Sequence, residues 1–538
     1  MANDVKLVYE DLSPLAKGDS TATSDDKREF VDMSDLSSDV LTMFPEYALC
    51  LPRYSKLNGQ YVNAPNTLPT SGMGYVSSSI SDENGEFGDN PKITITFTQK
   101  HTSVGLNLVF NPYSGDYASS VNIKWYSDDT LLSDKDFTPN SSDYACMNNV
   151  ELFNKIIIEF KKTSKPYRYV FLGGIIYGVT RTYGNSELKR VNLLSELSQI
   201  SEELTINTFG FTLVSKDNTD FLFQKQQKLK LYDSNGLLGS FYLDTANRLS
   251  SNSYDINTYD AIGILEQTNF AGGIYTNVTA GGLLASIFAD SGVEYTVDEV
   301  TSAKTISGYM PIMTKREALC WVCIATGSVC DTTRSETVDI YRLNDTVVRT
   351  IGLDKQYEGT SIENTQVVTS VKVTAYGYSQ GTEYVQVFNE VLNGSTTIEF
   401  TEPLHSLAIT GGTITTSSTN YAIITGTGET VTLTGKKYNV STRVIEKSNP
   451  NVGALDVKNV IELNECTLIS SSNVEEIATR VLNYYLKTKK VNAKIILGDN
   501  DLGDKVTINT DYEGELTGTI EKLEISGNNK LAGSVVVR

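Results

Sequence analysis

Few side chains in this sequence could perform acid–base or nucleophilic chemistry. Only two histidines, His101 and His405, occur in 538 residues, and neither lies in a recognisable serine or cysteine motif. Histidine is the most common general base, so most Ser-His and Cys-His schemes are excluded. A glycosidase that works with two carboxylates needs no histidine, but 65 Asp and Glu residues do not identify a particular pair. We expect no catalytic residues, no cofactor and no enzymatic activity.

Candidate metal ligands are equally sparse. Cys320 and Cys323 have the spacing of a zinc-binding pair, but the residues around them are apolar, and neither a second pair nor a nearby histidine is present. We therefore predict that both cysteines pack in a core. Asp499, Asp501 and Asp504 could gather a cation, although a polar hairpin is the favoured interpretation. The six cysteines are scattered, which favours reduced thiols over a disulfide framework, and no bound metal is expected.

Composition limits the partners and the location. Lys and Arg total 45 against 65 Asp and Glu, which gives a formal net charge of −20 at pH 7. Proteins bind nucleic acid largely by releasing counterions from its phosphates, so DNA binding is not expected, although an acidic wall could line a channel through which DNA slides. Residues 1–10 lack the apolar core of a signal peptide. No apolar run of about 18 residues predicts a membrane span, and we expect assembly in the cytoplasm.

The clearest structural signal is a capped apolar helix. Thr314 and Glu317 have the spacing of a capping box, and every residue from Ala318 to Ala325 is apolar. A helix without a polar face must be buried on most sides, and Gly327 is placed to end it. Alternating residues at Val338–Tyr341 predict a strand that returns past the helix. We expect the helix to be the core of a mixed α+β module.

A second signal is the order of short motifs along the chain. The run ISGYMPIMTKREAL, residues 306–319, is followed by Ile-Ala-Thr-Gly and then by Asp331. This series resembles the hub proteins of phage tails and phage-tail-like particles. Further segments that resemble this family are Ile200–Thr208, Gly239–Leu243, Asp260–Leu265 and Leu502–Ile508. The resemblance covers most of the chain, and it implies a homotrimer of barrel-like modules that continues the symmetry of a tail tube.

The first 185 residues divide into an arm and a β-rich block. Residues 1–74 contain a charged N-terminal arm and a wrapping segment rich in Pro, Asn and Gly. Residues 75–185 contain alternating stretches such as Ile93–Phe97 and Val121–Trp125 between turn residues, a pattern that predicts a β-sandwich with Trp125 in its core. This block is similar to jelly-roll modules, carbohydrate-binding-like in shape, in tail proteins of phages with Gram-positive hosts.

The jelly-roll resemblance makes sugar binding a hypothesis and not a conclusion, because shape alone does not define function. The candidate carbohydrate contacts are tyrosines in or beside turn-rich segments, namely Tyr113, Tyr117, Tyr126 and Tyr144. The alternative is that the module serves as a spacer or docking surface.

The remaining chain divides into three regions. Residues 186–360 should form barrel-like α+β hub modules with short helices, 361–442 a small inserted β-domain, and 443–538 a C-terminal α+β hub module. Ser472 or Asn473 should cap an amphipathic helix in the last region, with Arg480 among the polar-face residues. The expected fold class is therefore α+β, mostly β and multi-domain.

The favoured function is a structural hub at the distal end of a phage tail or tail-like bacteriocin. We expect a homotrimer that joins the tail tube to tip and baseplate proteins within the particle, with a contractile tail slightly favoured. The first rival is a tail protein that binds a receptor or cell-wall glycan through its jelly roll. The second rival is a wall hydrolase, for which no recognisable catalytic segment is present.

Overall fold

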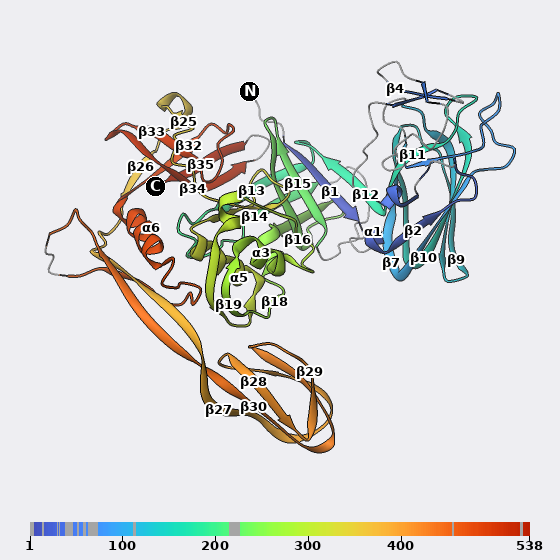
Figure 1. Ribbon diagram of the computed structural model, residues 1–538. Helices are drawn as coiled ribbons and strands as arrows, with labels where there is room; N and C mark the ends of the chain where they lie inside the picture. The colour runs from blue at the N-terminus through green and yellow to red at the C-terminus, as the bar shows by residue number, and fades with distance from the viewer. Residues whose placement is uncertain are drawn as a thin grey trace. The chain divides into compact units, whose positions relative to one another are not determined.

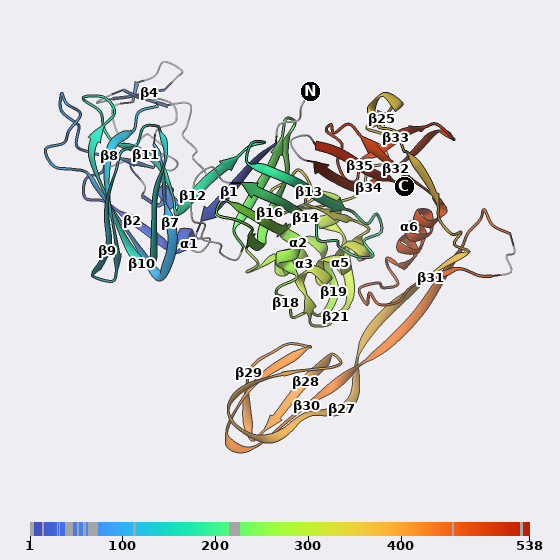
Figure 2. The same ribbon diagram turned by 180° about the vertical axis from the view of Figure 1, so that it is seen from behind.

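The computed structural model describes most of the residues of the chain. The chain divides into two units. The residues described are 5–12, 16–28, 31, 33–37, 47–50, 53–56, 61–62, 74–110, 115–214, 226–453, 457–527 and 531–538. The larger unit comprises Met1–Lys6, Gly184–Val214 and Lys230–Arg538, and the smaller comprises Leu7–Tyr183 and Ser215–Leu229. Strands dominate and helices are short, so the prediction of a mostly β, multi-domain α+β chain is confirmed (Figure 1, Figure 2).

The smaller unit is built on one antiparallel sheet with the strand order β6-β11-β7-β10-β8-β9, and β2 also pairs with β7. The strands are β2 (Ser20–Thr23), β6 (Tyr75–Val76), β7 (Lys92–Phe110), β8 (Ala118–Ser127), β9 (Thr130–Phe137), β10 (Asp143–Thr163) and β11 (Phe171–Ile176). Other elements are β1 (Lys6–Leu12), which pairs with β12 (Gly178–Tyr183), the small sheet β3 (Tyr47–Cys50), β4 (Arg53–Lys56) and β5 (Tyr61–Val62), and the short helices α1 (Ala16–Asp19) and η1 (Met33–Ser37).

Both halves of the long strand β7 contribute to the same core. Its core residues lie at odd positions from Ile93 to Phe97 and at even positions from Leu106 to Phe110. Side chains alternate strictly along a regular strand, so this change of phase requires an irregularity. The β7–β10 register shifts between Met147 and Lys155, where bulges bend the strands. Trp125 is fully buried in this core, as predicted.

Asp19, the last residue of α1, fastens its segment to β7. Its carboxylate accepts hydrogen bonds from the backbone N–H groups of Thr98 at 3.1 Å and Gln99 at 2.8 Å, and from the Thr98 hydroxyl. His101 Nε2 lies 2.8 Å from the same carboxylate. The hydrogen bonds from the Thr98 and His101 side chains hold the pKa of Asp19 far below its ordinary value. β2 follows directly and runs antiparallel to β7.

Replacing Asp19 by alanine should release β2. We expect the backbone amides of Ser20–Thr23 to exchange with deuterium much faster at pH 7, whereas Asp25→Ala, at a nearby exposed carboxylate, should leave them protected. Because the folded pKa is depressed, the contribution of Asp19 is present above the ordinary value near 4 and is lost as the pH falls through the folded value. Equal exchange in the two variants, measured by mass spectrometry, would contradict this role.

The larger unit contains a long sheet with the order β15-β16-β17-β14-β13-β34-β35-β32-β26. Its strands are β13 (Leu188–Glu196), β14 (Thr208–Val214), β15 (Lys228–Asp233), β16 (Gly236–Arg248), β17 (Ser253–Tyr259), β26 (Ser361–Asn364), β32 (Lys489–Ile495), β34 (Gly514–Gly527) and β35 (Leu531–Val537). β33 (Lys505–Thr510) pairs with β34, and β25 (Arg349–Ile351) pairs with β33. Over the described ranges, the sheet does not close into a barrel.

Short helices and small sheets complete the body of this unit. The helices are α2 (Ala261–Leu265), α3 (Ala280–Phe288), α4 (Glu299–Ala303), α5 (Lys315–Thr326), η3 (Leu353–Lys355) and α6 (Val474–Leu486). The small sheets pair β18 (Asn269–Phe270) with β22 (Met313–Thr314), β19 (Gly273–Thr279) with β21 (Thr305–Met310), and β24 (Val338–Tyr341) with both β20 (Tyr295–Val297) and β23 (Val329–Asp331). In the described part of the chain, no helix has the length and apolar character needed to cross a membrane.

Helix α5 confirms the prediction from the capping box. The Thr314 hydroxyl accepts from Glu317 N at 3.2 Å, and Thr314 N donates to the Glu317 carboxylate at 2.9 Å. Gly327 ends the helix in the left-handed conformation with φ 74°. The apolar stretch of α5 lies in one core with α2, α3, α6 and the start of β27 (Ser370–Glu399). The helix is therefore buried because its sequence provides no polar face.

Helix α6 begins as expected, but its N-terminal side chain has a different role. Asn473 is the N-cap residue, yet its side chain makes no capping hydrogen bond. Instead, Asn473 Nδ2 donates to Ala325 O in α5 at 3.1 Å, and Oδ1 accepts from Ser470 N at 2.8 Å. The predicted cap therefore binds α5, because the two helices meet at this point.

A long hairpin leaves the body between β26 and α6 (Figure 2). β27 pairs with β30 (Tyr421–Ser448) along nearly its whole length, with three register shifts. β28 (Leu404–Thr410) and β29 (Gly412–Ser417) add to β30 and enclose a small separate core, and β31 (Val460–Leu463) pairs with the base of β27. Asn420, in the loop between β29 and β30, also connects the hairpin to the body, because its Nδ2 donates to Met310 O in β21 at 2.8 Å.

Candidate functional site

The end of α5 and the start of α6 are joined by charged side chains. Glu476, in the first turn of α6, accepts from Lys304 Nζ at 2.7 Å and from Arg342 Nη2 at 3.1 Å. Both cations also donate to Thr326 O, in the last residue of α5, at 2.8 and 3.1 Å. Positive charge stabilises a helix C-terminus and negative charge an N-terminus. The four residues therefore stabilise both helix ends at one junction.

One turn further along α6, Arg480 turns towards the interior. Its Nη2 donates to Gln199 O at 2.6 Å and to Ser328 O at 3.1 Å, and it lies 3.4 Å from Ser201 Oγ. Burial lowers the pKa of Arg480 to about 10, so the guanidinium remains charged at neutral pH. The helical pattern places Arg480 on the polar face, but its charged end instead binds backbone carbonyls that need a donor.

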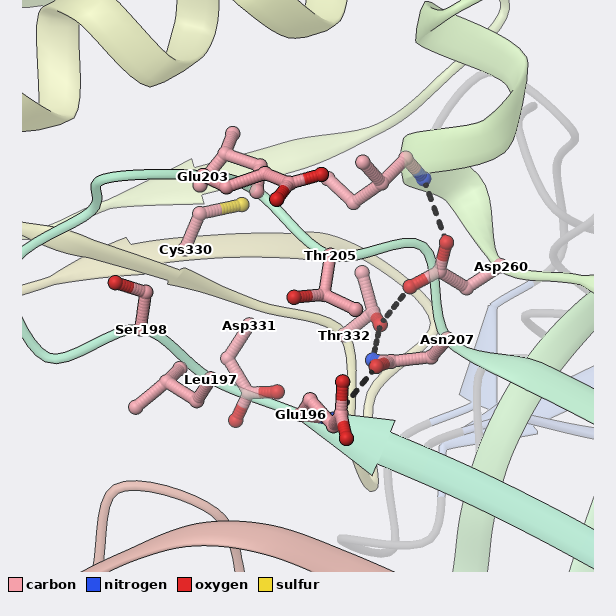
Figure 3. Close-up of a pocket in the computed structure, with 12 residues that line it drawn as sticks. Glu196, Leu197, Ser198, Glu203, Thr205, Asn207, Asp260, Cys330, Asp331 and Thr332 are labelled. Carbon is pink, nitrogen blue, oxygen red and sulfur yellow. Dashed lines mark hydrogen bonds between the residues drawn. The ribbon is translucent and has the colours of Figure 1, made fainter.

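A second polar cluster surrounds Asp260, the N-cap of α2 (Figure 3). Asp260 Oδ1 accepts from Ile262 N at 3.1 Å, and Oδ2 accepts from Thr332 Oγ1 at 2.7 Å. Asn207 Nδ2 in turn donates to Thr332 Oγ1 at 3.0 Å. Burial raises the pKa of Asp260 to about 6. Both oxygens of this carboxyl group therefore accept structural hydrogen bonds, one from the start of a helix and one from the hydroxyl of the residue that follows β23.

The cavity at this cluster is too small for a substrate. Four carboxyl groups line it, from Glu196, Glu203, Asp260 and Asp331. Its volume of about 10 Å³ is close to the minimum that holds one water molecule. Pockets for small-molecule ligands usually enclose roughly 300 to 1,000 Å³. Several carboxylates are thus brought together, but the arrangement cannot admit a sugar ring between them.

Thr333 connects Asp331 to the loop between β32 and β33. Thr333 N donates to Asp331 Oδ1 at 2.9 Å, and Thr333 Oγ1 lies 2.7 Å from Asp501 Oδ1. Burial, and then the charge of Asp501, raise the pKa of Asp331 to about 7. Gly239 in β16 forms a β-bridge with Thr333. Segments from three distant parts of the sequence meet at this threonine.

The three aspartates that could gather a cation have separate partners. Asp501 faces Thr333, whereas Asp499 and Asp504 both pair with Arg349. Arg349 Nη2 lies 3.1 Å from Asp504 Oδ2. Among the residues that the structure describes, no group of three or more His, Cys, Asp or Glu side chains is arranged to hold a metal ion. The absence of a bound metal or cofactor stays a prediction.

The two cysteines with zinc-like spacing lie in the core around α5, as predicted for packing residues. Burial raises the pKa of Cys320 to about 12 and that of Cys323 to about 11. The Cys320 thiol donates to Ser201 O at 3.1 Å. Because the thiolate is the form that attacks, the raised pKa makes these thiols poor nucleophiles.

The candidate sugar-binding tyrosines have different surroundings. Tyr113 lies outside the described residues. Tyr117 and Tyr144 pack against the core of the smaller unit. Lys155 Nζ lies 4.9 Å from the centroid of the Tyr126 ring. Carbohydrate contact through these side chains stays a prediction, as does the jelly-roll assignment.

The two histidines also occupy unrelated places. His101 belongs to the Asp19 contact in the smaller unit. His405 Nδ1 lies 3.0 Å from Ser406 Oγ, and its ring packs edge-on against Tyr438 at 4.9 Å between centroids. Neither histidine lines the cavity at Asp260.

Sequence reasoning did not single out the polar clusters at Asp260 and Arg480. One local signal was present, since Asp260 directly precedes a short apolar run and is therefore typical of an N-cap. The partners gave no such signal, because Thr332 lies 72 residues from Asp260 and Gln199 lies 281 residues from Arg480. Nothing in local spacing indicates contacts of that range.

No protein-family model and no curated protein matches this chain. Among solved structures, it is similar to a 43 kDa prophage tail protein from Shewanella oneidensis, with 9% identity and a TM-score of 0.44 over 66% of this chain and 95% of the other. A tail protein from Neisseria meningitidis gives 8% identity and a TM-score of 0.44 over 66% and 93%. An E. coli protein described as a type VI secretion component gives 8% identity and a TM-score of 0.35 over 65% and 73%. Because the sequence identities are below 10% and the TM-scores below 0.5, these structural similarities do not assign a function.

Proposed function

We propose that this chain is a non-enzymatic structural hub at the distal end of a phage tail or tail-like particle, where it joins the tail tube to tip and baseplate proteins. The observation that carries the proposal is that the segments that resemble such hubs are joined to the rest of the larger unit by hydrogen bonds. Ser201, Asp260 and Asp331 come from three of these segments, and each has its polar groups bonded within the larger unit. Such a network holds modules in one arrangement, as a load-transmitting component requires.

The cavity at Asp260 supports a structural role over a hydrolytic one. An inverting glycosidase needs its two carboxyl groups roughly 6.5 to 9.5 Å apart with a sugar and a water between them. Here the carboxyl groups surround about 10 Å³ of space. The hydrogen bonds to Asp260 and Asp331 come from groups of the chain itself. These carboxyl groups are thereby committed to holding loops in place.

Self-association is supported by exposed apolar side chains in the larger unit. Val347, Val348, Leu353, Tyr357 and Ile496 are each between 41% and 50% exposed. Hydrogen bonds from Tyr357 N to Lys494 O and from Ile496 N to Lys355 O bring two of their segments side by side. Exposed apolar side chains on neighbouring segments, as at Tyr357 and Ile496, are typical of protein–protein interfaces.

A trimer should have a mass of about 177 kDa by light scattering, three times the 59.0 kDa of one chain. Charging the exposed cluster with Leu353→Glu and Tyr357→Glu together should return the monomer, because a charge cannot be buried unpaired at an interface. Leu249→Glu, at another exposed apolar residue, is the matched control and should remain trimeric. A wild-type mass of 59.0 kDa at every concentration would contradict the homotrimer.

A further inference from the structure

One hydroxyl in the larger unit is surrounded by more acceptors than it has protons. Thr333 Oγ1 lies 2.9 Å from Asp331 Oδ1, 2.8 Å from Asp331 Oδ2 and 2.7 Å from Asp501 Oδ1. A threonine hydroxyl carries a single donor hydrogen. If both carboxyl groups were ionised, the hydroxyl could donate to one of them, and its lone pairs would face the oxygens of the other at less than 3 Å. An additional proton on one carboxyl group resolves this conflict.

The other hydrogen bonds indicate where that proton lies. Asp331 Oδ1 accepts from Thr333 N at 2.9 Å, and Asp501 Oδ1 accepts from Leu502 N at 2.9 Å. Asp331 Oδ2 is the remaining carboxyl oxygen in contact with the hydroxyl. We propose that Asp331, Thr333 and Asp501 form a proton-dependent joint, in which protonated Asp331 Oδ2 donates to Thr333 Oγ1 and the Thr333 hydroxyl donates to ionised Asp501. This inference goes beyond the proposed structural role and does not depend on it.

The surrounding charges favour retention of the proton. Burial, followed by the charge of Asp501, raises the pKa of Asp331 to about 7. Other titratable groups that face the pair are Cys330 of β23, Tyr341 of β24 and Asp504 of the β32–β33 loop. Glu196, Glu203 and Asp260 line the same cavity as Asp331. The nearby cations have other partners, because Arg334 donates to Leu237 O and Gly498 O, and Arg349 pairs with Asp499 and Asp504. In the described chain, no ion pair includes Asp331 or Asp501.

The joint connects two parts of the larger unit that are distant in sequence. Asp331 is the last residue of β23, directly after α5, and Asp501 lies between β32 and β33 of the long sheet. The joint is closed when Thr333 Oγ1 contacts both Asp331 and Asp501, and it is open when these contacts are broken. Asp331 binds a proton more tightly in the closed joint than in the open one. The closed joint is therefore most stable in mild acid, and it weakens as the pH rises from the ordinary aspartate value towards the closed-state value. Above that value no further change is expected.

Hydrogen exchange of the full chain tests the joint. The equilibrium constant for opening of residues 331–334 and 498–504 should rise about tenfold per pH unit between roughly pH 4 and 7, after correction for the intrinsic pH dependence of exchange. Asp331→Asn should remove the contribution of Asp331, because its amide donates to Thr333 Oγ1 at every pH. The dependence that remains should be that of Asp260, which accepts from Thr332 and has a pKa raised to about 6. Asp499→Asn, at an exposed carboxylate on the same loop, should retain the full dependence.

An infrared spectrum supplies an independent readout. The wild-type protein at pH 5 should show protonated carboxyl absorption from both Asp331 and Asp260. Asp331→Asn should remove one component and leave that of Asp260, whereas Asp499→Asn should retain both. Exchange in these segments that follows the same pH course in the wild type and in Asp331→Asn would overturn the proposal. The same conclusion would follow if the protonated carboxyl absorption were unaffected by Asp331→Asn.

Discussion

Replacing Arg480 by alanine is expected to lower the free energy of unfolding of the larger unit by about 3 kcal/mol. The variant removes one cation and leaves Gln199 O without its donor, whereas Ser328 O keeps the hydrogen bond from the Ser201 hydroxyl. Hydrogen bonds from charged groups contribute roughly 1.5 to 3 kcal/mol each, and a buried carbonyl without a partner is itself destabilising. The effect should be large because α6 has few other polar contacts with these two backbone segments.

Denaturant unfolding followed by Trp321 fluorescence is the appropriate measurement. Trp321 packs against the core of the larger unit, whereas the second tryptophan, Trp125, lies in the smaller unit. Arg480→Lys should recover only part of the loss, because an ammonium group cannot reproduce the planar geometry of a guanidinium. Arg443→Ala, at an exposed arginine on β30, is the control and should change stability by less than about 0.5 kcal/mol. Equal effects of the alanine variants at positions 480 and 443 would show that Arg480 has no such role.

Gly308→Ala should be the second severe variant, with a loss of about 4 kcal/mol. Gly308 is the glycine of the ISGYMP run, and its φ of 150° is rarely adopted by other residues. A Cβ atom at this position would lie 2.3 Å from Thr467 O, a backbone atom that cannot move away cheaply. The contact is part of the body, because Tyr309 N donates to Thr467 O at 3.3 Å. The substitution should therefore separate β21 from the segment before α6.

Gly359→Ala separates the clash from the backbone strain. Gly359 also has a positive φ, 105°, but a Cβ there would meet no atom within 4 Å. Its loss should be limited to about 1 kcal/mol, from the unfavourable backbone conformation alone. The same denaturation assay applies to both variants. If Gly308→Ala proved no worse than Gly359→Ala, close packing would not be the reason for a glycine at position 308.

The sequence predicts well the elements whose boundaries and faces are determined by residues close to them in the chain. The boundaries of α5 follow from Thr314, Glu317 and Gly327, all of which act within one helical turn of a helix end. The inward face of α6 likewise follows from its apolar spacing, with Val474, Ile477 and Val481 buried as expected. Such features depend on neighbours in the sequence, and they need no knowledge of the tertiary structure.

The candidate site was not predictable for the opposite reason. The hydrogen bond between Thr333 and Asp501 joins residues 168 positions apart. The local spacing around Asp501 predicts a polar hairpin or a cation site, and it does not indicate this partner. Ser472 or Asn473 was expected to cap α6, but α5 lies close enough to bind the Asn473 side chain instead. The long hairpin shows a similar limit, because its alternating segments predict strands but do not reveal that β27 and β30 pair through several bulges.

The most direct test of the central claim is an image of the intact particle by electron cryomicroscopy at a resolution that allows this chain to be traced. A hub should appear as three copies around the tail axis, at the distal end of the tube and in contact with tip or baseplate proteins. A single copy, or copies placed away from the axis, would contradict the hub assignment.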